Sequence, residues 1–313
     1  MIRSTLDSIA YLLKEINENQ NSKSLRKELS KHVHKLKDWL DVPKNTKFIE
    51  KLKENIVDND NIFHYLNFLG NFSFEDEKVI FRLFKIAISD EFIVDCLSKS
   101  SITFNKLSKD NLGSDSYVYF KILSTICERE KISKSFLRLR LMNKIFGLLK
   151  QNRFDVVIDA FDLLNGIIFK HKAISDQYFW ENYIEFKTNL IDLIDNCDLH
   201  IQIWTLKLIY DIVSDTKFVL VNEKILVDSD FLISIMNQMK RSQIGISFEA
   251  FNCFKFFIWN PNKNFKIKKI FKVNRINIIR LMKEFVSRFH TETFIVECEY
   301  VVNSLIKLDL NKA

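Results

Sequence analysis

The chain has 313 residues, of which 47% are hydrophobic and 28% are charged, so it can bury a sizeable core and is too apolar to be disordered. It contains only 5 glycines and 2 prolines, too few for turn-rich β-structure or for an α/β sheet with its many tight connections. We therefore expect an all-helical protein. The net charge of +7 favours an acidic partner only weakly, because many basic proteins bind no nucleic acid.

No targeting or membrane-spanning signal is visible in the sequence. The longest apolar runs, such as FFIW at 256–259, are far shorter than the roughly 18 residues of a membrane span. The five cysteines occur singly, mostly among apolar neighbours, as small buried side chains do in a reducing compartment. These features predict a cytoplasmic protein.

Residues 1–57 form the predicted N-terminal cap. They read as two or three helices with many charged residues, including SLRKELSKHVHKLKDWL at 24–40. The terminal repeats of a helical solenoid need a polar outer face, so this composition suits a cap. Within it, His32 and His34 are two positions apart on a predicted helix, which points their rings to different faces and disfavours a shared metal ion.

Residues 58–285 contain a repeated pattern. One residue followed by apolar, polar, apolar and apolar positions recurs in five helical stretches: IFRLF from Ile80, YFKIL from Tyr119, AFDLL from Ala160, TLKLI from Thr205 and AFNCF from Ala250. Successive intervals are 39, 41, 45 and 45 residues, close to the length of armadillo and HEAT repeats. We predict an armadillo/HEAT-like solenoid, an α-α superhelix with three helices per repeat, curved around a concave binding face.

The C-terminal segment, 286–313, is predicted to hold one more helix, TETFIVECEYVVNSLIKLDL at 291–310, and a short tail. Before it, Asn260 and Pro261 predict the start of a helix, with Asn as the N-cap and Pro in the first turn. No linker rich in Pro, Gly or Ser interrupts the chain. We therefore expect one continuous domain over residues 1–313.

Each repeated helix should expose one narrow row of side chains on the concave side. The rows are Lys78, Arg82 and Lys85; Tyr117, Lys121 and Ser124; Asp159, Asp162 and Asn165; Ile203, Trp204, Lys207 and Asp211; and Glu249, Asn252 and Lys255. In the fourth row, Ile203 and Trp204 lie three to four residues before Lys207 and share its face. A tryptophan in a groove anchors partners well, although packing of Trp204 against the next repeat is an equal alternative.

No catalytic motif is present, because the sequence has no GxGxxG, GxxxxGK[ST], HExxH or GxSxG. We therefore predict no enzyme activity, no cofactor and no metal ion. Two binding functions remain open beside a kinase scaffold: an adaptor for another protein, and a helical-repeat RNA binder. The cluster Lys263, Lys266, Lys268, Lys269, Lys272 and Arg275 could neutralise phosphates, but Asp159 and Asp162 would repel a nucleic-acid backbone.

The stretch FEAFNCFKFFIWNPNK at 248–263 resembles the signature of the calcium-binding protein 39 family, the armadillo-like kinase scaffolds. FDVVIDAFDLL from Phe154, FKHK at 169–172, TLKLI from Thr205 and IMNQM from Ile235 continue the resemblance, which is strong over 150–285 and faint in the N-terminal half. The resemblance implies a cytosolic scaffold that binds and activates a kinase or pseudokinase of the sterile-twenty type, in a network of the kind that governs cell polarity and morphogenesis. It also implies that a Trp-Glu-Phe-like tail of the kinase enters an apolar pocket near the C-terminal repeats.

Several residues carry over from the family by position. Phe154 and Lys207 correspond to residues of the concave face that touch the kinase, and Met236 corresponds to a methionine of the tail pocket. We place Ile203 and Trp204 beside Lys207, and Phe251 beside Met236. Ile203 and Thr216 stand where the family has arginines, so the contact at Ile203 becomes apolar. We expect the chain to be a monomer on its own.

Overall fold

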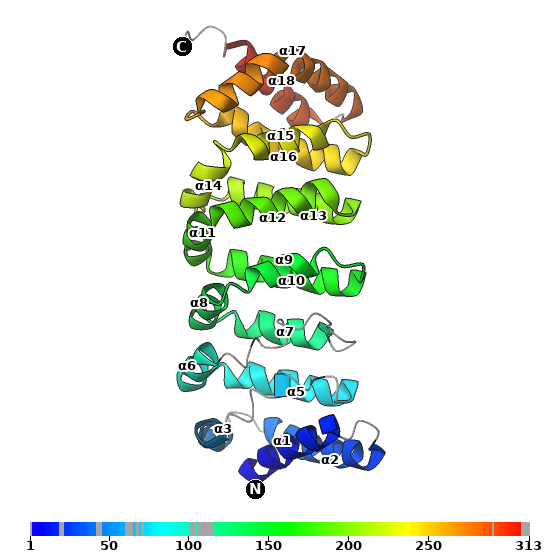
Figure 1. Cartoon of the computed structure of the whole chain (residues 1–313), viewed down its shortest axis with the longest axis vertical. Helices are drawn as coiled ribbons and strands as arrows, with labels where there is room; N and C mark the ends of the chain where they lie inside the picture. The colour runs from blue at the N-terminus through cyan, green and yellow to red at the C-terminus, as the bar shows by residue number, and fades with distance from the viewer. Residues whose placement is uncertain are drawn as a thin grey trace. The chain divides into compact units, whose positions relative to one another are not determined.

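The computed structural model is helical, and it contains no β-strand among the residues that it describes (Figure 1). These residues are 2–18, 22–41, 46–59, 65–66, 69, 72–100, 104, 116–289 and 291–307. The all-helical fold predicted from the scarcity of glycine and proline is thus confirmed. The chain divides into two compact units, residues 1–171 and 172–313, which are described separately below. That the two units form one continuous domain stays a prediction.

The first unit begins with three helices, α1 (Ile2–Glu18), α2 (Lys23–Leu40) and α3 (Thr46–Asn59), and their role as a cap stays a prediction. The helices that follow are α5 (Phe74–Ala87), α6 (Glu91–Lys99), α7 (Ser116–Ile126), α8 (Glu130–Arg138), α9 (Met142–Leu148) and α10 (Phe154–Lys170). The helix α5 packs against α2 and α7, and α7 packs against α10. These helices therefore form successive layers (Figure 1).

The second unit contains eight described helices. They are α11 (Lys172–Glu181), α12 (Tyr183–Asn196), α13 (Leu199–Ser214), α14 (Val219–Ile225), α15 (Ser229–Met239), α16 (Ile244–Trp259), α17 (Phe265–Arg288) and α18 (Glu292–Lys307). The helix α16 packs against α13 and α15, and α18 packs against α16 and α17. α17 ends at Arg288, three residues beyond the predicted end of the repeats at residue 285.

The five repeated sequence motifs all lie on helices, namely α5, α7, α10, α13 and α16. Over residues 130–259 the order is three helices per repeat: α8–α10, α11–α13 and α14–α16. Apart from the half-buried Phe81, the apolar positions of each motif are buried on both sides of its polar residue, as Leu206, Leu208 and Ile209 are around Lys207. The burial of such side chains stabilises the fold by about 1.5 to 3 kcal/mol each. The pattern that defined the repeats is therefore the pattern of the core.

Polar contacts between neighbouring repeats show the same period. The buried Asp176 of α11 accepts hydrogen bonds from the backbone N–H groups of Leu220 (3.0 Å) and Val221 (2.8 Å), which follow it by 44 and 45 residues. The residue at the N-cap of α14, Phe218, has no side-chain acceptor. Because the first N–H groups of a helix lack intrahelical partners, Asp176 caps α14 from the preceding repeat.

The start of α15 is held by α12 in a similar way. The Tyr183 hydroxyl donates to Asp228 Oδ2 (3.0 Å), and Lys187 Nζ pairs with the carboxylates of Asp228 (3.1 Å) and Asp230 (2.8 Å). Asp228 is also the N-cap of α15, accepting from the N–H groups of Asp230 and Phe231. The polar contacts thus fix the register in which one repeat stacks on the next.

The connection from α16 to α17 differs from the prediction. Asn260 is the C-cap of α16, not an N-cap, and Pro261 lies in the turn that follows. The N-cap of α17 is Asn264, whose side chain accepts from the Ile267 N–H (2.9 Å). The ammonium of Lys263 explains why a turn follows α16. It donates to two carbonyls at the end of α16, where the helix dipole favours a cation. The chain must turn after Asn260 for the Lys263 side chain to reach these carbonyls.

Lys255 also departs from the predicted exposed row. The residue is only 6% exposed, because α18 covers this part of α16, and its ammonium pairs with Glu297 of α18. Glu249 and Asn252, the other members of that row, are half-buried. The row is therefore much narrower than the sequence pattern suggests.

Candidate partner-binding sites

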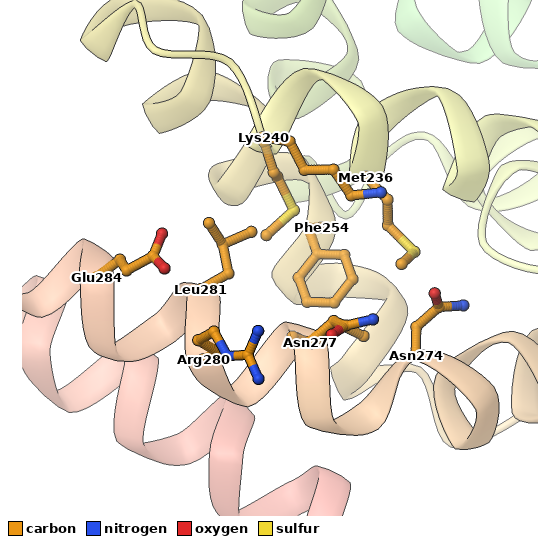
Figure 2. A pocket seen from close by; sticks show the side chains of 10 residues that line it. Met236, Lys240, Phe254, Asn274, Asn277, Arg280, Leu281 and Glu284 are labelled. Carbon is orange, nitrogen blue, oxygen red and sulfur yellow. The ribbon is translucent and has the colours of Figure 1, made fainter.

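A cavity of about 210 Å³ opens between α15, α16 and α17 (Figure 2). Its apolar lining consists of Met236 and Met239 from α15, Phe254 from α16, and Ile278 and Leu281 from α17. An apolar cavity of about 150 Å³ accepts a benzene molecule. The cavity therefore has room for an aromatic or a large aliphatic side chain of a partner.

The rim of this cavity is polar and carries two cations, two amides and one carboxylate. It is formed by Lys240, Asn274, Asn277, Arg280 and Glu284. Figure 2 shows Lys240 on the α15 side and Arg280 on the α17 side, with the ring of Phe254 between them. A guanidinium presents paired N–H donors that match a carboxylate. The arrangement suits a peptide in which a bulky apolar side chain stands next to an acidic group.

Helix periodicity explains why Met236 lies in this lining. Capping by Asp228 sets the start of α15. Leu232, Ile235, Met236 and Met239 then follow at intervals that keep them on one buried face. Met236 is at the outer edge of that face, where the cavity opens. Met236 therefore borders this cavity, and its contact with the tail of a partner stays a prediction.

Phe251 does not line this cavity. Its side chain is fully buried, with its ring 5.9 Å from that of Phe285 and 4.7 Å from that of Phe294. Phe254 takes its place in the lining, because three residues along α16 turn the side chain from the α18 side toward α15 and α17. Phe251 is therefore a core residue.

A second candidate surface lies on α13. Ile203 and Trp204 are half-buried, whereas Lys207 is exposed one turn later. The Trp204 ring meets the ring of His200 edge-on, with centroids 6.4 Å apart. Ile203 packs close to the first turn of α16, where a Cβ atom on Gly245 would lie 3.2 Å from Ile203 Cδ1. Ile203 and Trp204 thus pack against neighbouring side chains and are also partly exposed. Trp204 is therefore neither a fully exposed anchor in a groove nor a fully buried core residue.

A carboxylate completes the charge pattern of this surface. Asp211 lies four residues after Lys207, and burial raises the pKa of its carboxyl, although the charge of Lys207 opposes the rise. One basic, one acidic and two apolar side chains therefore share two turns of α13. Such a surface can contact a folded partner through both apolar area and hydrogen bonds.

Phe154 belongs to the first unit. It is the first residue of α10, and its side chain is largely exposed. The three α13 residues belong to the second unit, so the grouping of Phe154 with Ile203, Trp204 and Lys207 on one face stays a prediction. Farther along α10, burial and the nearby carboxylates of Asp162 and Asp155 raise the pKa of Asp159.

The sequence reading missed Phe254, Lys240 and the whole contribution of α17. A signal for α17 existed, because its buried residues Ile267, Phe271, Ile278, Met282 and Phe285 recur at helical spacing. The many basic residues on its other face make charge the more evident feature of this segment. Arg280 and Met236 border the same cavity only because α15, α16 and α17 pack together.

Within the described part of the chain, no group of three or more His, Cys, Asp or Glu side chains is arranged to hold a metal ion. None of the described helices combines the length and the apolar character needed to cross a membrane.

The fold defines an armadillo-type helical-repeat protein, and an apolar cavity lies between α15, α16 and α17. A family model described as Mo25-like matches residues 1–309. The chain belongs to the Mo25-like family, which confirms the resemblance found in the sequence.

Related proteins occur in fungi, animals and algae. The chain is 23% identical to the Mo25-like protein of Schizosaccharomyces pombe, with 98% of this chain and 97% of that protein covered. It is 22% identical to the mouse protein called calcium-binding protein 39-like, with 100% and 95% covered. The degreening-related gene dee76 protein of Auxenochlorella protothecoides is 28% identical over 176 residues, and the chain spans about half of its length (55%).

Two solved structures are similar to the chain to different degrees. An engineered protein of known crystal structure superposes with a TM-score of 0.52 at 12% identity, covering 95% of this chain and 78% of its own. This likeness concerns the fold alone. A designed armadillo repeat protein reaches a TM-score of 0.45 at 12% identity, covering 82% of this chain and 100% of its own.

Proposed function

We propose that this chain is a non-catalytic cytoplasmic scaffold that binds and activates a kinase or pseudokinase of the sterile-twenty type. The observation that carries the proposal is the apolar cavity between α15, α16 and α17, with Lys240 and Arg280 at its rim. A kinase tail ending in a Trp-Glu-Phe-like sequence offers large aromatic side chains for the cavity and a carboxylate for the cations. Membership of the Mo25-like family supports the same assignment.

The body of the kinase would contact a different surface. Lys207 would meet polar or acidic groups of the kinase, while Ile203 and Trp204 would supply apolar contact, with Phe154 as a further contact on α10. Activation requires that the scaffold bind the active conformation of the kinase better than the inactive one. A difference of about 1 to 3 kcal/mol is enough to shift the balance strongly.

Peptide binding tests the pocket. A fluorescent peptide ending in Trp-Glu-Phe should bind the full chain, and Met236→Ala should weaken it about tenfold, which corresponds to about 1.4 kcal/mol. Met282→Ala is the matched control, because Met282 is a buried methionine of α17 that lies outside this cavity. The control should lose thermal stability but keep its peptide affinity. Equal losses of affinity in the two variants would make Met236 a structural residue only.

Kinase identification tests the rest of the proposal. Affinity purification with the full chain should recover a kinase of the sterile-twenty type, and adding the purified chain should raise the activity of that kinase. The variant Lys207→Glu should lower the activation while leaving the affinity for the isolated tail peptide unchanged. A recovered kinase whose activity does not respond to the chain would reduce the role to assembly.

A further inference from the structure

The outer side of α17 presents a stripe of basic and apolar side chains. Its members, called the α17 stripe below, are Phe265, Lys269, Lys272, Val273, Ile276 and Arg280, the last of which also borders the cavity of Figure 2. At about 100° per residue these positions fall within an arc of about 100° on the helix. From the first to the last, the stripe is about 22 Å long.

The apolar members of the stripe are unusually exposed. Phe265 is 75%, Val273 72% and Ile276 69% exposed. They are not needed for the core, because the opposite side of α17 is already buried through another set of apolar residues. Single exposed apolar residues are ordinary, but three on one face of a helix, with basic residues between them, indicate a surface that meets an apolar medium or a partner.

The whole of α17 is strongly basic, and three of its basic residues belong to the stripe. The helix contains eight Lys or Arg residues and a single Glu, an excess of seven positive charges, which equals the net charge of the entire chain (+7). Lys269 and Lys272, in the middle of the stripe, are exposed and have no ion-pair partner among the residues that the structure describes. Their charge is therefore available to an anionic partner.

The mixture of the two kinds of side chain indicates the partner. We propose that the α17 stripe binds the surface of an anionic lipid bilayer, with the helix parallel to the membrane plane. In this orientation the three apolar side chains enter the interfacial layer while the lysines remain at the level of the headgroups. The exposed face of a long helix fits such a flat surface along its whole length.

A nucleic acid fits the stripe less well. Single-stranded nucleic acids are bound through stacking of bases on aromatic rings, and the stripe has one aromatic residue, Phe265, beside the aliphatic Val273 and Ile276. Aliphatic side chains placed between phosphates would lose hydration without gaining a contact. They gain apolar contact in the interfacial layer of a bilayer.

Vesicle binding tests the proposal. The full chain is sedimented with vesicles of phosphatidylcholine alone, or of phosphatidylcholine with about one third phosphatidylserine. Binding is expected only to the vesicles that contain phosphatidylserine, and it should decrease as salt is raised. The double variant Lys269→Glu/Lys272→Glu should weaken binding at least about tenfold. Equal binding to both kinds of vesicle, or to neither, overturns the proposal.

Two further variants separate charge from insertion. Lys144→Glu/Lys150→Glu makes the same charge change at exposed lysines of the first unit, and it should leave vesicle binding within about twofold. Ile276→Ser should weaken binding about threefold without lowering the thermal transition, because the side chain is exposed. A full effect of the control pair would make the binding a matter of net charge only. Retention on single-stranded RNA but not on vesicles would assign the stripe to a nucleic acid instead.

Discussion

The ammonium of Lys255 lies 2.7 Å from Glu297 Oε1 and joins α16 to α18. Lys255 is nearly inaccessible, whereas about a third of the Glu297 side chain is exposed (30%). The ammonium also lies 5.5 Å from the ring centre of Trp259 and 5.8 Å from that of Tyr210. The two partners of this ion pair therefore stand in unequal environments.

The inequality predicts unequal costs of substitution. Glu297→Gln should lower the free energy of unfolding by about 2 to 3 kcal/mol, because it leaves a buried ammonium without a counter-charge. Lys255→Met should cost about 1 kcal/mol or less, because Glu297 can turn to water and methionine fills the same space. Urea unfolding at neutral pH measures both. A larger cost for Lys255→Met would contradict the assignment of the buried partner.

Because Asp176 caps α14, its substitution should have a large effect on the stability of the fold. Asp176→Ala should lower the free energy of unfolding by about 2 kcal/mol, because the N–H groups of Leu220 and Val221 lose their acceptor. Asp176→Asn keeps one acceptor and should cost less. The exposed Asp162→Ala serves as the control and should stay within about 0.5 kcal/mol of the parent chain. Similar losses at both aspartates would show that α14 is capped in another way.

The carboxylates of α10 predict opposite responses to pH. Burial and the charges of Asp162 and Asp155 raise the pKa of Asp159, so the folded chain binds the proton of Asp159 more readily than the unfolded chain does. Ionised Asp159 therefore costs stability above that pKa. Asp159→Asn should stabilise the fold by about 0.5 kcal/mol at neutral pH, after allowance for solvent screening. The gain should disappear as the pH falls to about 4.

Asp155 is the matched control for this experiment. Its hydrogen bond with Arg153 lowers the pKa of its carboxyl, so its contribution to stability is present above the ordinary pKa and is lost as the pH falls through the lowered one. Asp155→Asn should therefore destabilise the fold at neutral pH. Thermal unfolding of both variants at neutral pH gives the two signs, and continuing the series below about pH 4 should remove the loss caused by Asp155→Asn. The same sign for both variants would be inconsistent with these pKa directions.

The cysteines should differ in reactivity. Burial raises the pKa of the Cys127 and Cys298 thiols to about 12, and that of Cys253 well above its usual value, whereas Cys96 and Cys197 are half-buried. An alkylating reagent at about pH 8 should modify Cys96 and Cys197 in the folded chain and all five cysteines after unfolding. Peptide mass mapping identifies the modified residues. Rapid modification of Cys253 in the folded chain would mean that α16 opens locally.

The helical repeats could be predicted from the sequence because the apolar positions of each motif are the positions that the fold buries. Ala160, Thr205 and Ala250 begin equivalent buried runs, and a helix that is packed on both flanks leaves only a narrow polar stripe. Met236 could be placed in a pocket through the resemblance to a known family. The repeats and this one residue followed from local pattern and resemblance.

The rest of the candidate site depends on contacts between distant segments. Lys255 reads as exposed until α18, some 40 residues later, covers it. Phe251 and Phe254 are equally apolar, and only the positions of α17 and α18 decide which of them borders the cavity. Arg280 has no motif of its own. Such contacts join residues that are far apart in the sequence, so they leave no local pattern and can be found only from the three-dimensional structure.

The cap at α14 has a consequence for how a chain of this kind can lengthen. If the segment 215–259 were duplicated in tandem, the second copy of α14 would have the first copy of α14 before it, in the place that α11 has now. Val221 follows Asp176 by 45 residues, which is the length of the duplicated segment. Val221 would therefore stand where the second copy of α14 needs the carboxylate of Asp176. The second copy of Asp228 would likewise lose its Tyr183, since the residue 45 positions after Tyr183 is Asp228 itself. Each repeat is thus matched to the one before it. The number and order of the repeats in this segment are therefore encoded in its polar side chains.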